Sequence, residues 1–116
     1  MLRAPRRRPL EAAQLRSALA SWDPIERIAA IGRAARRPDV EEALIEAASD
    51  ADPQVRRAVA RALGRQGTRR AVTELARVAA EDSMWPVRAE AIAALGTMLG
   101  RSDQSATGKA TSPRDA

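Results

Sequence analysis

The 116-residue chain contains no histidine, cysteine, tyrosine or phenylalanine, and its aromatic residues are two tryptophans. Histidine is the commonest metal ligand and the usual general base near neutral pH, while cysteine supplies thiolate ligands, nucleophiles and disulfides. The absence of both excludes zinc sites, cysteine nucleophiles and Ser-His-Asp triads. It also excludes a disulfide-stapled secreted domain, so we expect a reducing, cytoplasmic setting.

Long apolar runs are missing as well. No stretch approaches the roughly 18 apolar residues that a membrane span needs. The basic residues at the N-terminus lead into charged sequence rather than an apolar stretch, which is unlike a secretory signal. We therefore expect one soluble domain, since domains usually run to about 100 to 200 residues.

The net charge of +5 is carried by the two ends of the chain. Residues 1–8 hold four arginines, namely Arg3, Arg6, Arg7 and Arg8, whereas residues 9–100 hold 13 arginines and 13 acids, which cancel. We expect residues 1–8 to form a basic disordered arm and residues 9–100 to form the folded domain. Residues 101–116 lack large apolar side chains, so we expect a disordered polar tail there.

The alanine-rich middle of the chain contains an internal repeat. Gly32, Gly64 and Gly96 are spaced by 32 residues. The same shift superposes further residues: Val55 on Val87, Arg56 on Arg88, and Ala62-Leu63-Gly64 on Ala94-Leu95-Gly96. Matches at a single offset indicate a repeated structural unit.

Each unit is predicted to contain two helices. One apolar stripe has the i, i+3, i+4, i+7, i+8 spacing of an amphipathic helix; it consists of Val55, Ala58, Val59, Ala62 and Leu63. Asp52 is the expected N-cap of this helix, Pro53 its first residue, and Gly67 the left-handed residue that ends it. The following helix would start after Thr68 as its N-cap and bury Ala71 or Val72, Leu75, and Val78 or Ala79.

Applied to the whole chain, these patterns predict six helices and no strand. The expected ranges are 9–20, 23–36, 38–49, 52–66, 68–81 and 84–99. A single helical hairpin cannot bury its apolar face alone, but stacked hairpins can. The predicted fold class is therefore all-α, an α-solenoid of about two and a half to three stacked hairpins.

The run from Asp50 to Gly67 resembles a HEAT repeat of the short bacterial type, also called phycobilisome-lyase-like HEAT repeats, and the segment from Asp82 to Gly96 is a second match. The first unit departs from the pattern. At the 32-residue offset Asp23, Glu26 and Arg27 fall on core positions, and a shifted stripe of Ile25, Ile28, Ala29 and Gly32 takes their place. We interpret this unit as a degenerate, near-terminal repeat.

The resemblance implies roles for two kinds of residue. In such repeats an Asp and an Arg six residues later, here Asp50 with Arg56 and Asp82 with Arg88, form an electrostatic ladder between neighbouring repeats. The repeated glycines are expected to permit close contact with the following helix.

Some relatives of this repeat type are enzymes, including phycobilin lyases, deoxyhypusine hydroxylase and DNA glycosylases. This chain has no histidine for a di-iron site and no constellation for a chromophore. Glu41 and Glu42 are adjacent, so their side chains point in different directions on a helix and form no acid/base dyad. We predict no catalytic residue, no cofactor, no metal site and no small-molecule substrate.

The predicted function is a non-catalytic protein-protein interaction or assembly module, with a protein partner or self-association. The alternative is non-specific binding to a nucleic-acid backbone through an arginine-rich rim and the basic arm. The candidate partner-binding residues are Trp22, Trp85, Leu99, Arg36, Arg37, Arg69 and Arg70.

These candidates rest on three arguments. Each tryptophan lies at a helix start, beside Asp23-Pro24 or Pro86, where it either staples onto the next turn or anchors a partner. The arginines follow the first helix of successive units, so stacking would align them along one rim, opposite a rim of acids that includes Asp50 and Asp82. Leu99 lies with Ile92 and Leu95 in the last helix, which lacks a following partner.

Overall fold

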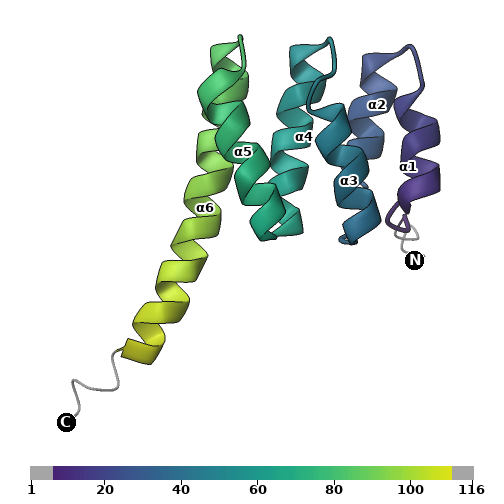
Figure 1. Ribbon diagram of the computed structural model, residues 1–116. Helices are drawn as coiled ribbons and strands as arrows, with labels where there is room; N and C mark the ends of the chain where they lie inside the picture. Colours follow the sequence, from purple (N-terminus) through teal and green to yellow (C-terminus); the bar gives the residue numbers. More distant parts are fainter. Residues whose placement is uncertain (1–6, 111–116) are drawn as a thin grey trace, which may run out of the picture.

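The computed structural model describes residues 7–110, and the side chains of residues 7–101. This part of the chain contains six helices: α1 (Ala12–Leu19), α2 (Pro24–Ile31), α3 (Pro38–Ala47), α4 (Pro53–Gln66), α5 (Arg69–Glu81) and α6 (Trp85–Ala110). They stack side by side in a row that runs from the N-terminal to the C-terminal end (Figure 1).

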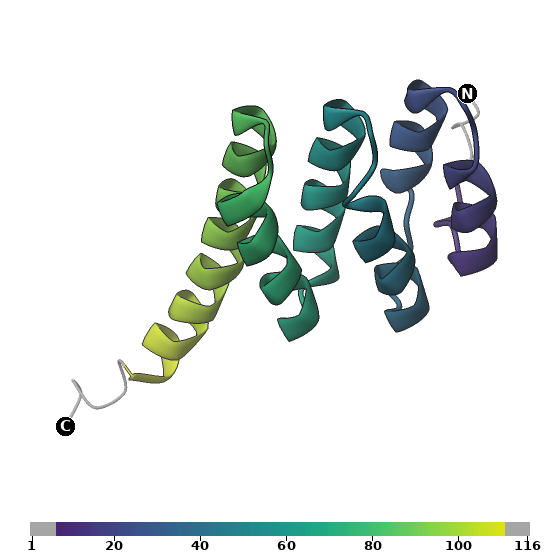
Figure 2. The ribbon, with the colours of Figure 1, turned by 45° about the horizontal axis from the view of Figure 1, so that its top comes forward.

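The helices form two layers (Figures 1 and 2). Layer A contains α2, α4 and α6, and layer B contains α1, α3 and α5. Neighbours contact each other within a layer, as α4 does with α2 and α6, and also across the layers, as α4 does with α3 and α5. This arrangement confirms the predicted all-α solenoid of stacked hairpins.

The predicted core stripe of α4 is confirmed. Its members Val55, Ala58, Val59, Ala62 and Leu63 are all buried. In α5 the buried residues are Ala71, Leu75 and Val78, while Val72 and Ala79 are half-buried. The spacing of apolar residues therefore predicted which faces of these two helices pack into the core.

The caps of the second repeat are confirmed too. The Asp52 side chain accepts a hydrogen bond from the backbone N–H of Gln54 at 2.7 Å, and the Thr68 hydroxyl accepts one from Ala71 at 3.0 Å. Gly67 has φ 72°, the left-handed conformation that ends α4. Glycine adopts it without the steric cost that a Cβ would bring.

The N-terminal end is closed by α1 and by the extended segment that precedes it. Leu15 is fully buried, and Leu10 and Leu19 pack against the core. The Leu10 N–H donates to the Arg33 carbonyl at 2.6 Å, and Leu10 accepts from the Ala35 N–H at 2.9 Å. Because this backbone pairs with residues 33–35, the predicted start at residue 9 and the predicted helix end at residue 36 were wrong.

The first repeat is in a different register from the one predicted. Ile25 and Ala29 of the predicted stripe are exposed, and α2 instead buries Ala30 and Ile31. The reason is that this repeat is three residues shorter between its arginine and the next aspartate, 23 residues from Arg27 to Asp50 against 26 from Arg56 to Asp82. Residues 21–27 therefore correspond to residues 50–56, a shift of 29 rather than 32.

Only one of the repeated glycines has the predicted role. A Cβ added at Gly64 would lie 3.2 Å from the Ala94 Cβ of α6, so Gly64 permits close packing of α4 and α6. A Cβ at Gly96 would meet nothing within 4 Å, and one at Gly32 would meet only carbonyl oxygens of α2. The prediction was wrong for these two glycines because no following helix approaches them among the described residues.

Helix α6 continues to Ala110, ten residues into the region expected to be a polar tail. A helix that is already nucleated needs no large apolar side chains to extend, since each further residue adds a hydrogen bond. Residues 111–116 of that region, and residues 1–6 of the basic arm, lie outside the described residues, whereas Arg7 and Arg8 are exposed. No helix of the described part is both long and apolar enough to cross a membrane.

Candidate functional site

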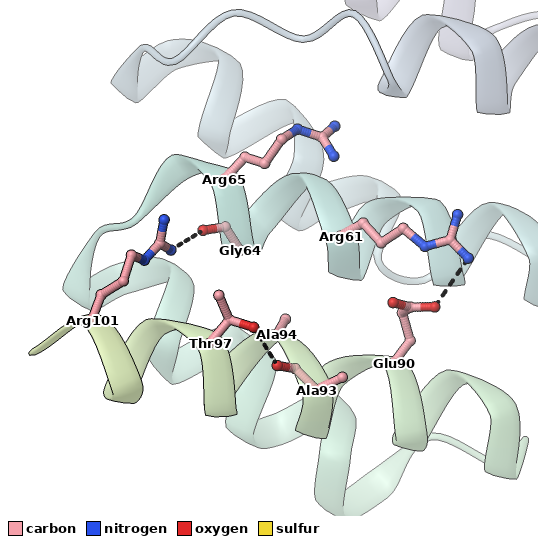
Figure 3. A pocket seen from close by; sticks show the side chains of 8 residues that line it. All are labelled: Arg61, Gly64, Arg65, Glu90, Ala93, Ala94, Thr97 and Arg101. Atoms are coloured by element: carbon pink, nitrogen blue, oxygen red, sulfur yellow. Dashed lines mark hydrogen bonds and ion pairs between the residues drawn. The ribbon is translucent and has the colours of Figure 1, made fainter. Parts of the chain in front are cut away.

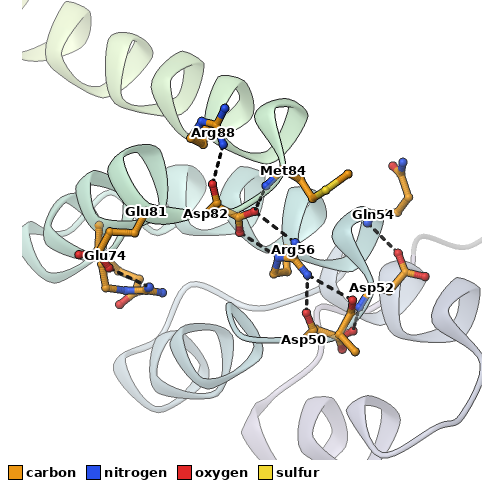
Figure 4. Close-up of polar contacts among 11 residues, drawn as sticks. Asp50, Asp52, Gln54, Arg56, Glu74, Glu81, Asp82, Met84 and Arg88 are labelled. Atoms are coloured by element: carbon orange, nitrogen blue, oxygen red, sulfur yellow. Dashed lines mark hydrogen bonds and ion pairs between the residues drawn. The ribbon is translucent and has the colours of Figure 1, made fainter.

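An arginine of α4 forms a bidentate ion pair with the aspartate that follows α5. The Arg56 Nε and Nη2 donate to the two carboxylate oxygens of Asp82 at 2.8 and 3.2 Å, and Arg56 Nη1 donates to the Asp50 carbonyl at 2.8 Å (Figure 4). Asp82 also accepts from the Met84 N–H at 3.0 Å. Both side chains of the ion pair are largely buried. The pair therefore links α4 to the end of α5 with fixed geometry.

The same contacts recur one repeat earlier. Arg27 donates to the two carboxylate oxygens of Asp50 at 2.9 and 3.1 Å, and its Nη1 donates to the Ser21 carbonyl at 2.8 Å. The predicted ladder between repeats is thus confirmed, as the Arg–Asp ladder of Arg27–Asp50 and Arg56–Asp82. The sequence reading missed Arg27, although its six-residue spacing from Ser21 matches the spacing of the other two units.

The ladder sets the charge state of Asp82. Burial raises the pKa of the Asp82 carboxyl, but the hydrogen bonds from Arg56 and the Met84 N–H oppose it, as do the charges of Arg56 and Arg88. The net effect holds the pKa below its ordinary value. Asp50 and Asp82 lie in the α3–α4 and α5–α6 connections, at the predicted rim, but both are paired and largely buried, so they add no exposed negative charge to it.

Arg88 begins a third unit of the ladder that the described residues do not complete. Its Nη1 donates to the Asp82 carbonyl at 2.7 Å, as Arg56 does to the Asp50 carbonyl. Among residues 7–101 no carboxylate lies within ion-pair distance of Arg88. The guanidinium is therefore held in the same pose as its two counterparts but lacks their partner.

Close to Arg88, the last helix exposes an apolar stripe. The C-terminal stripe, which we define as Ile92, Leu95 and Leu99 of α6, follows Arg88 at i+4, i+7 and i+11. Ile92 is 59% exposed, Leu99 is 58% exposed and Leu95 is half-buried. The uncovered end predicted from the sequence is therefore confirmed.

A comparison with α4 shows why the C-terminal stripe is exposed. At the 32-residue shift Ile92 corresponds to Ala60 and Leu95 to Leu63, which are 1% and 0% exposed. Helix α4 packs against helices on both sides, whereas the helices of the described chain that pack against α6 are α4 and α5, on one side. The equivalent face of α6 thus lacks the helices that cover it on α4.

The two tryptophans are exposed and lie far apart. Trp22 is 90% exposed and Trp85 is 69% exposed, which excludes the first of the two alternatives, a hydrophobic staple that buries the ring. Trp22 precedes α2 and Trp85 begins α6. The starts of these two helices lie at the same edge of the solenoid but toward opposite ends of the row (Figure 1). They do not form one binding site.

The arginine rim is brought together only in part. Arg36 and Arg37 border a hollow between the α2–α3 and α4–α5 connections, and Arg69 and Arg70 start α5 close to that edge. All four are exposed. Two are paired with acids: Arg37 with Glu11 at 3.7 Å and Asp39 at 3.4 Å, and Arg70 with Glu42 at 3.6 Å. The rim is thus less positive than its sequence suggests.

The floor of this hollow contains a buried carboxylate. Glu41 is 3% exposed and accepts from the Thr68 hydroxyl at 2.7 and 2.8 Å. Glu42 faces solvent, as predicted for adjacent helical positions. Since Thr68 also caps α5, Glu41 ties the start of α5 to α3.

A second basic groove lies between α4 and α6 (Figure 3). Its charged lining residues are Arg61, Arg65, Arg101 and Glu90. Arg61 pairs with Glu90 at 3.1 Å, and the Arg101 Nη2 donates to the Gly64 carbonyl at 3.5 Å. Within residues whose side chains are described, no group of three or more His, Cys, Asp or Glu residues is arranged to hold a metal ion.

Comparison with known proteins agrees with this geometry. The family model of HEAT repeats matches residues 12–96, which include α1 to α5 and the first half of α6. No curated protein and no solved structure matches the chain. The match covers more than half of the sequence and the region in which the Arg–Asp ladder repeats, so the chain belongs to the HEAT-repeat family.

Proposed function

We propose that this chain is a non-catalytic protein-interaction module that binds another protein through the C-terminal stripe of α6. The observation that carries the proposal is the exposure of Ile92 at 59%, where the equivalent Ala60 of α4 is 1% exposed. HEAT repeats generally serve interaction or scaffolding. Covering this stripe would remove apolar area from water, which is the main favourable term in protein association.

The shape of the exposed area supports the same proposal. Ile92, Leu95 and Leu99 lie on one face of a helix, the spacing with which helices pack against each other. Layer B contains α1, α3 and α5, so the place beside α6 that a further layer B helix would take is open within the described chain. A helix of a partner would fit there without any rearrangement of α4 or α5.

The alternative function is binding of a nucleic-acid backbone. It is supported by the groove between α4 and α6, which is lined by Arg61, Arg65 and Arg101 (Figure 3). Glu90 lies in the same groove and pairs with Arg61. This pairing lowers the net positive charge that a phosphate backbone would meet. We therefore place protein binding first.

A site-specific crosslink tests the first proposal. A photo-reactive amino acid replaces Leu99 in the full chain, and a matched control places it at Ile25, which is also exposed but lies on α2 at the other end. Irradiation of the cell extract, with and without nuclease, should give a defined protein adduct from position 99 alone. The adduct should survive nuclease treatment.

A second variant separates binding from folding. Leu99→Asp should abolish the adduct formed by a photo-reactive residue at Ile92 while circular dichroism shows an unchanged helical signal and thermal midpoint, because Leu99 is exposed. Adducts of equal yield from positions 99 and 25 would contradict a specific surface on α6. Retention that collapses with nuclease and falls steeply with salt would favour nucleic-acid binding instead.

A further inference from the structure

We propose that the partner covers the C-terminal stripe with a helix whose last turn is followed by a carboxylate, and that this carboxylate completes the Arg–Asp ladder at Arg88. This inference rests on the proposed function and names the chemistry of the partner. Two arginines of the molecule, Arg27 and Arg56, each bind such a carboxylate through two hydrogen bonds.

Arg88 has the same pose as the two arginines that are paired in the ladder. Arg27 and Arg56 each donate Nη1 to a backbone carbonyl six residues earlier, at 2.8 Å, and Arg88 does the same at 2.7 Å. In the first two cases Nε and Nη2 are left to take a carboxylate with two parallel bonds. The bond to the Asp82 carbonyl therefore orients the Arg88 guanidinium before any partner arrives, which reduces the ordering cost of binding.

The ladder also defines the direction of the partner helix. Asp82 follows the last residue of α5, and α5 runs antiparallel to α4 (Figure 1). A helix that reproduces this relationship on α6 would start near Leu99 and end near Arg88. Its apolar face would then cover Ile92 and Leu95, and the carboxylate after its last turn would pair with Arg88.

The chain's own C-terminal carboxylates do not fit this role. At ~1.5 Å per residue, the backbone of α6 at Ala110 is about 33 Å from Arg88. Asp115 follows five residues later, and five extended residues span about 18 Å at most, which is too short to return to Arg88. Asp103 lies within α6 itself, 15 residues further along the same helix than Arg88, and so it cannot follow the end of a second helix.

A second copy of the chain fits less well than another protein. Stacked head to tail, it would present α1 to α6, because α1 is the first helix of layer B. The residue at the ladder position after α1 is Ser21, whose carbonyl is bonded to Arg27 as that of Asp50 is to Arg56. Serine has no carboxylate, so the ladder would stay open at Arg88.

A peptide of the chain's own α5 is the natural probe, because it carries the required features in the required register. Residues 67–84, acetylated and amidated to remove the terminal charges, are labelled and titrated into the full-length protein by fluorescence anisotropy. The matched control peptide contains Asp82→Asn. We expect saturable binding of the first peptide and about tenfold weaker binding of the second, since a paired, bidentate carboxylate makes charge-assisted bonds.

Variants of the protein assign this difference to Arg88. In Arg88→Gln the two peptides should bind equally weakly, and Arg88→Asp should prefer a peptide with Asp82→Arg over the natural one. Leu99→Asp should abolish binding of every peptide. Circular dichroism of each variant confirms that the fold is intact.

The outcomes separate the inference from the proposed function. Equal binding of both peptides to the wild type, still abolished by Leu99→Asp, would overturn the carboxylate and keep the apolar surface. No binding of either peptide up to millimolar concentration would overturn the docked helix, while the crosslink from position 99 decides the proposed function independently. Sedimentation that shows dimers lost in Arg88→Gln would overturn the inference in favour of a second copy.

Discussion

The Arg56 guanidinium spans two repeats, because it holds the Asp82 carboxylate at 2.8 and 3.2 Å while it donates to the Asp50 carbonyl at 2.8 Å. The Asp50 carboxylate in turn accepts two hydrogen bonds from Arg27. Each aspartate thus contributes its carboxylate to one arginine and its carbonyl to the next. This continuity fixes the spacing between repeats at the edge where the connections α1–α2, α3–α4 and α5–α6 lie (Figures 1 and 4).

The ladder should stabilise the fold measurably. Arg56→Gln and Asp82→Asn should each lower the free energy of unfolding by about 1.5 to 3 kcal/mol, since each leaves a largely buried partner without its charged hydrogen bonds. In a double-mutant cycle the two losses should not add, because both remove the same contact. Arg77→Gln is the control: its pair with Glu74 includes an exposed arginine, and its loss should be below ~1 kcal/mol.

Urea unfolding followed by circular dichroism gives the free energies of unfolding of the wild type, the two single variants, the double variant and Arg77→Gln. Losses that add fully in the cycle would contradict a direct pair between Arg56 and Asp82. If Arg77→Gln lowered the free energy of unfolding as much as Arg56→Gln, burial of the Arg56–Asp82 pair would make no difference to its contribution to stability.

The stability of the protein should fall in acid partly through Asp82. Its pKa is held below the ordinary value in the folded state, so the unfolded chain binds more protons than the folded chain as the pH falls. The stabilisation is therefore present above the unfolded pKa, near ~4, and is lost as the pH falls through the lower folded pKa. Between about pH 5 and pH 2 the wild type should lose stability more steeply than Asp82→Asn.

Urea midpoints measured across this pH range test the prediction. The curves of the wild type and Asp82→Asn should approach each other at the acid end, where the carboxyl is protonated in both states. Parallel curves would show that the Asp82 carboxyl has the same pKa in the folded and unfolded chain.

Features that depend on a few neighbouring residues were predictable from the sequence. The α4 stripe follows from helical spacing, and the caps at Asp52 and Thr68 follow from local hydrogen bonding. The exposed stripe at Ile92 and Leu99 was also predictable, because helical spacing places both residues on a face of α6 that no later helix of the described residues covers. These are the parts of the fold and of the candidate site where local pattern and tertiary structure agree.

Features that depend on the register between repeats were not predictable. A single 32-residue shift placed Arg27 on a core position, whereas the shorter first repeat makes it the first arginine of the ladder. The exposure of Trp22 and the empty space beside Gly96 likewise depend on which helices approach them. Sequence spacing within one repeat contains no information on the register between repeats or on which helices approach a given residue.

The two equivalent glycines Gly64 and Gly96 should respond differently to alanine. Both lie inside helices, where Gly→Ala usually stabilises by about 0.5 to 1 kcal/mol. At Gly96 nothing lies within 4 Å of the added Cβ, so the full gain is expected. At Gly64 the added Cβ would lie 3.2 Å from the Ala94 Cβ, which forces α4 and α6 apart and should turn the gain into a loss of about 1 kcal/mol or more.

Thermal and urea unfolding of the two single variants provide the comparison. Equal stabilisation of both would contradict the close approach of α4 and α6 at Gly64. A loss at Gly96 would mean that a further element covers that part of α6.

The equivalent leucines Leu63 and Leu95 should show how much the missing neighbours of α6 matter. Leu63 is fully buried, so Leu63→Ala should lower the free energy of unfolding by about 2 to 5 kcal/mol. Leu95 is only half-buried, so Leu95→Ala should cost clearly less in the isolated chain.

Urea unfolding at two protein concentrations checks this pair of variants. A loss below ~1 kcal/mol for Leu63→Ala would mean that the stacked core is assigned to the wrong face of α4. If Leu95→Ala cost as much as Leu63→Ala, and if the cost grew with protein concentration, the stripe would already be covered by another copy of the chain. A small, concentration-independent cost is expected instead, because a stripe exposed to solvent contributes little to the stability of the chain alone.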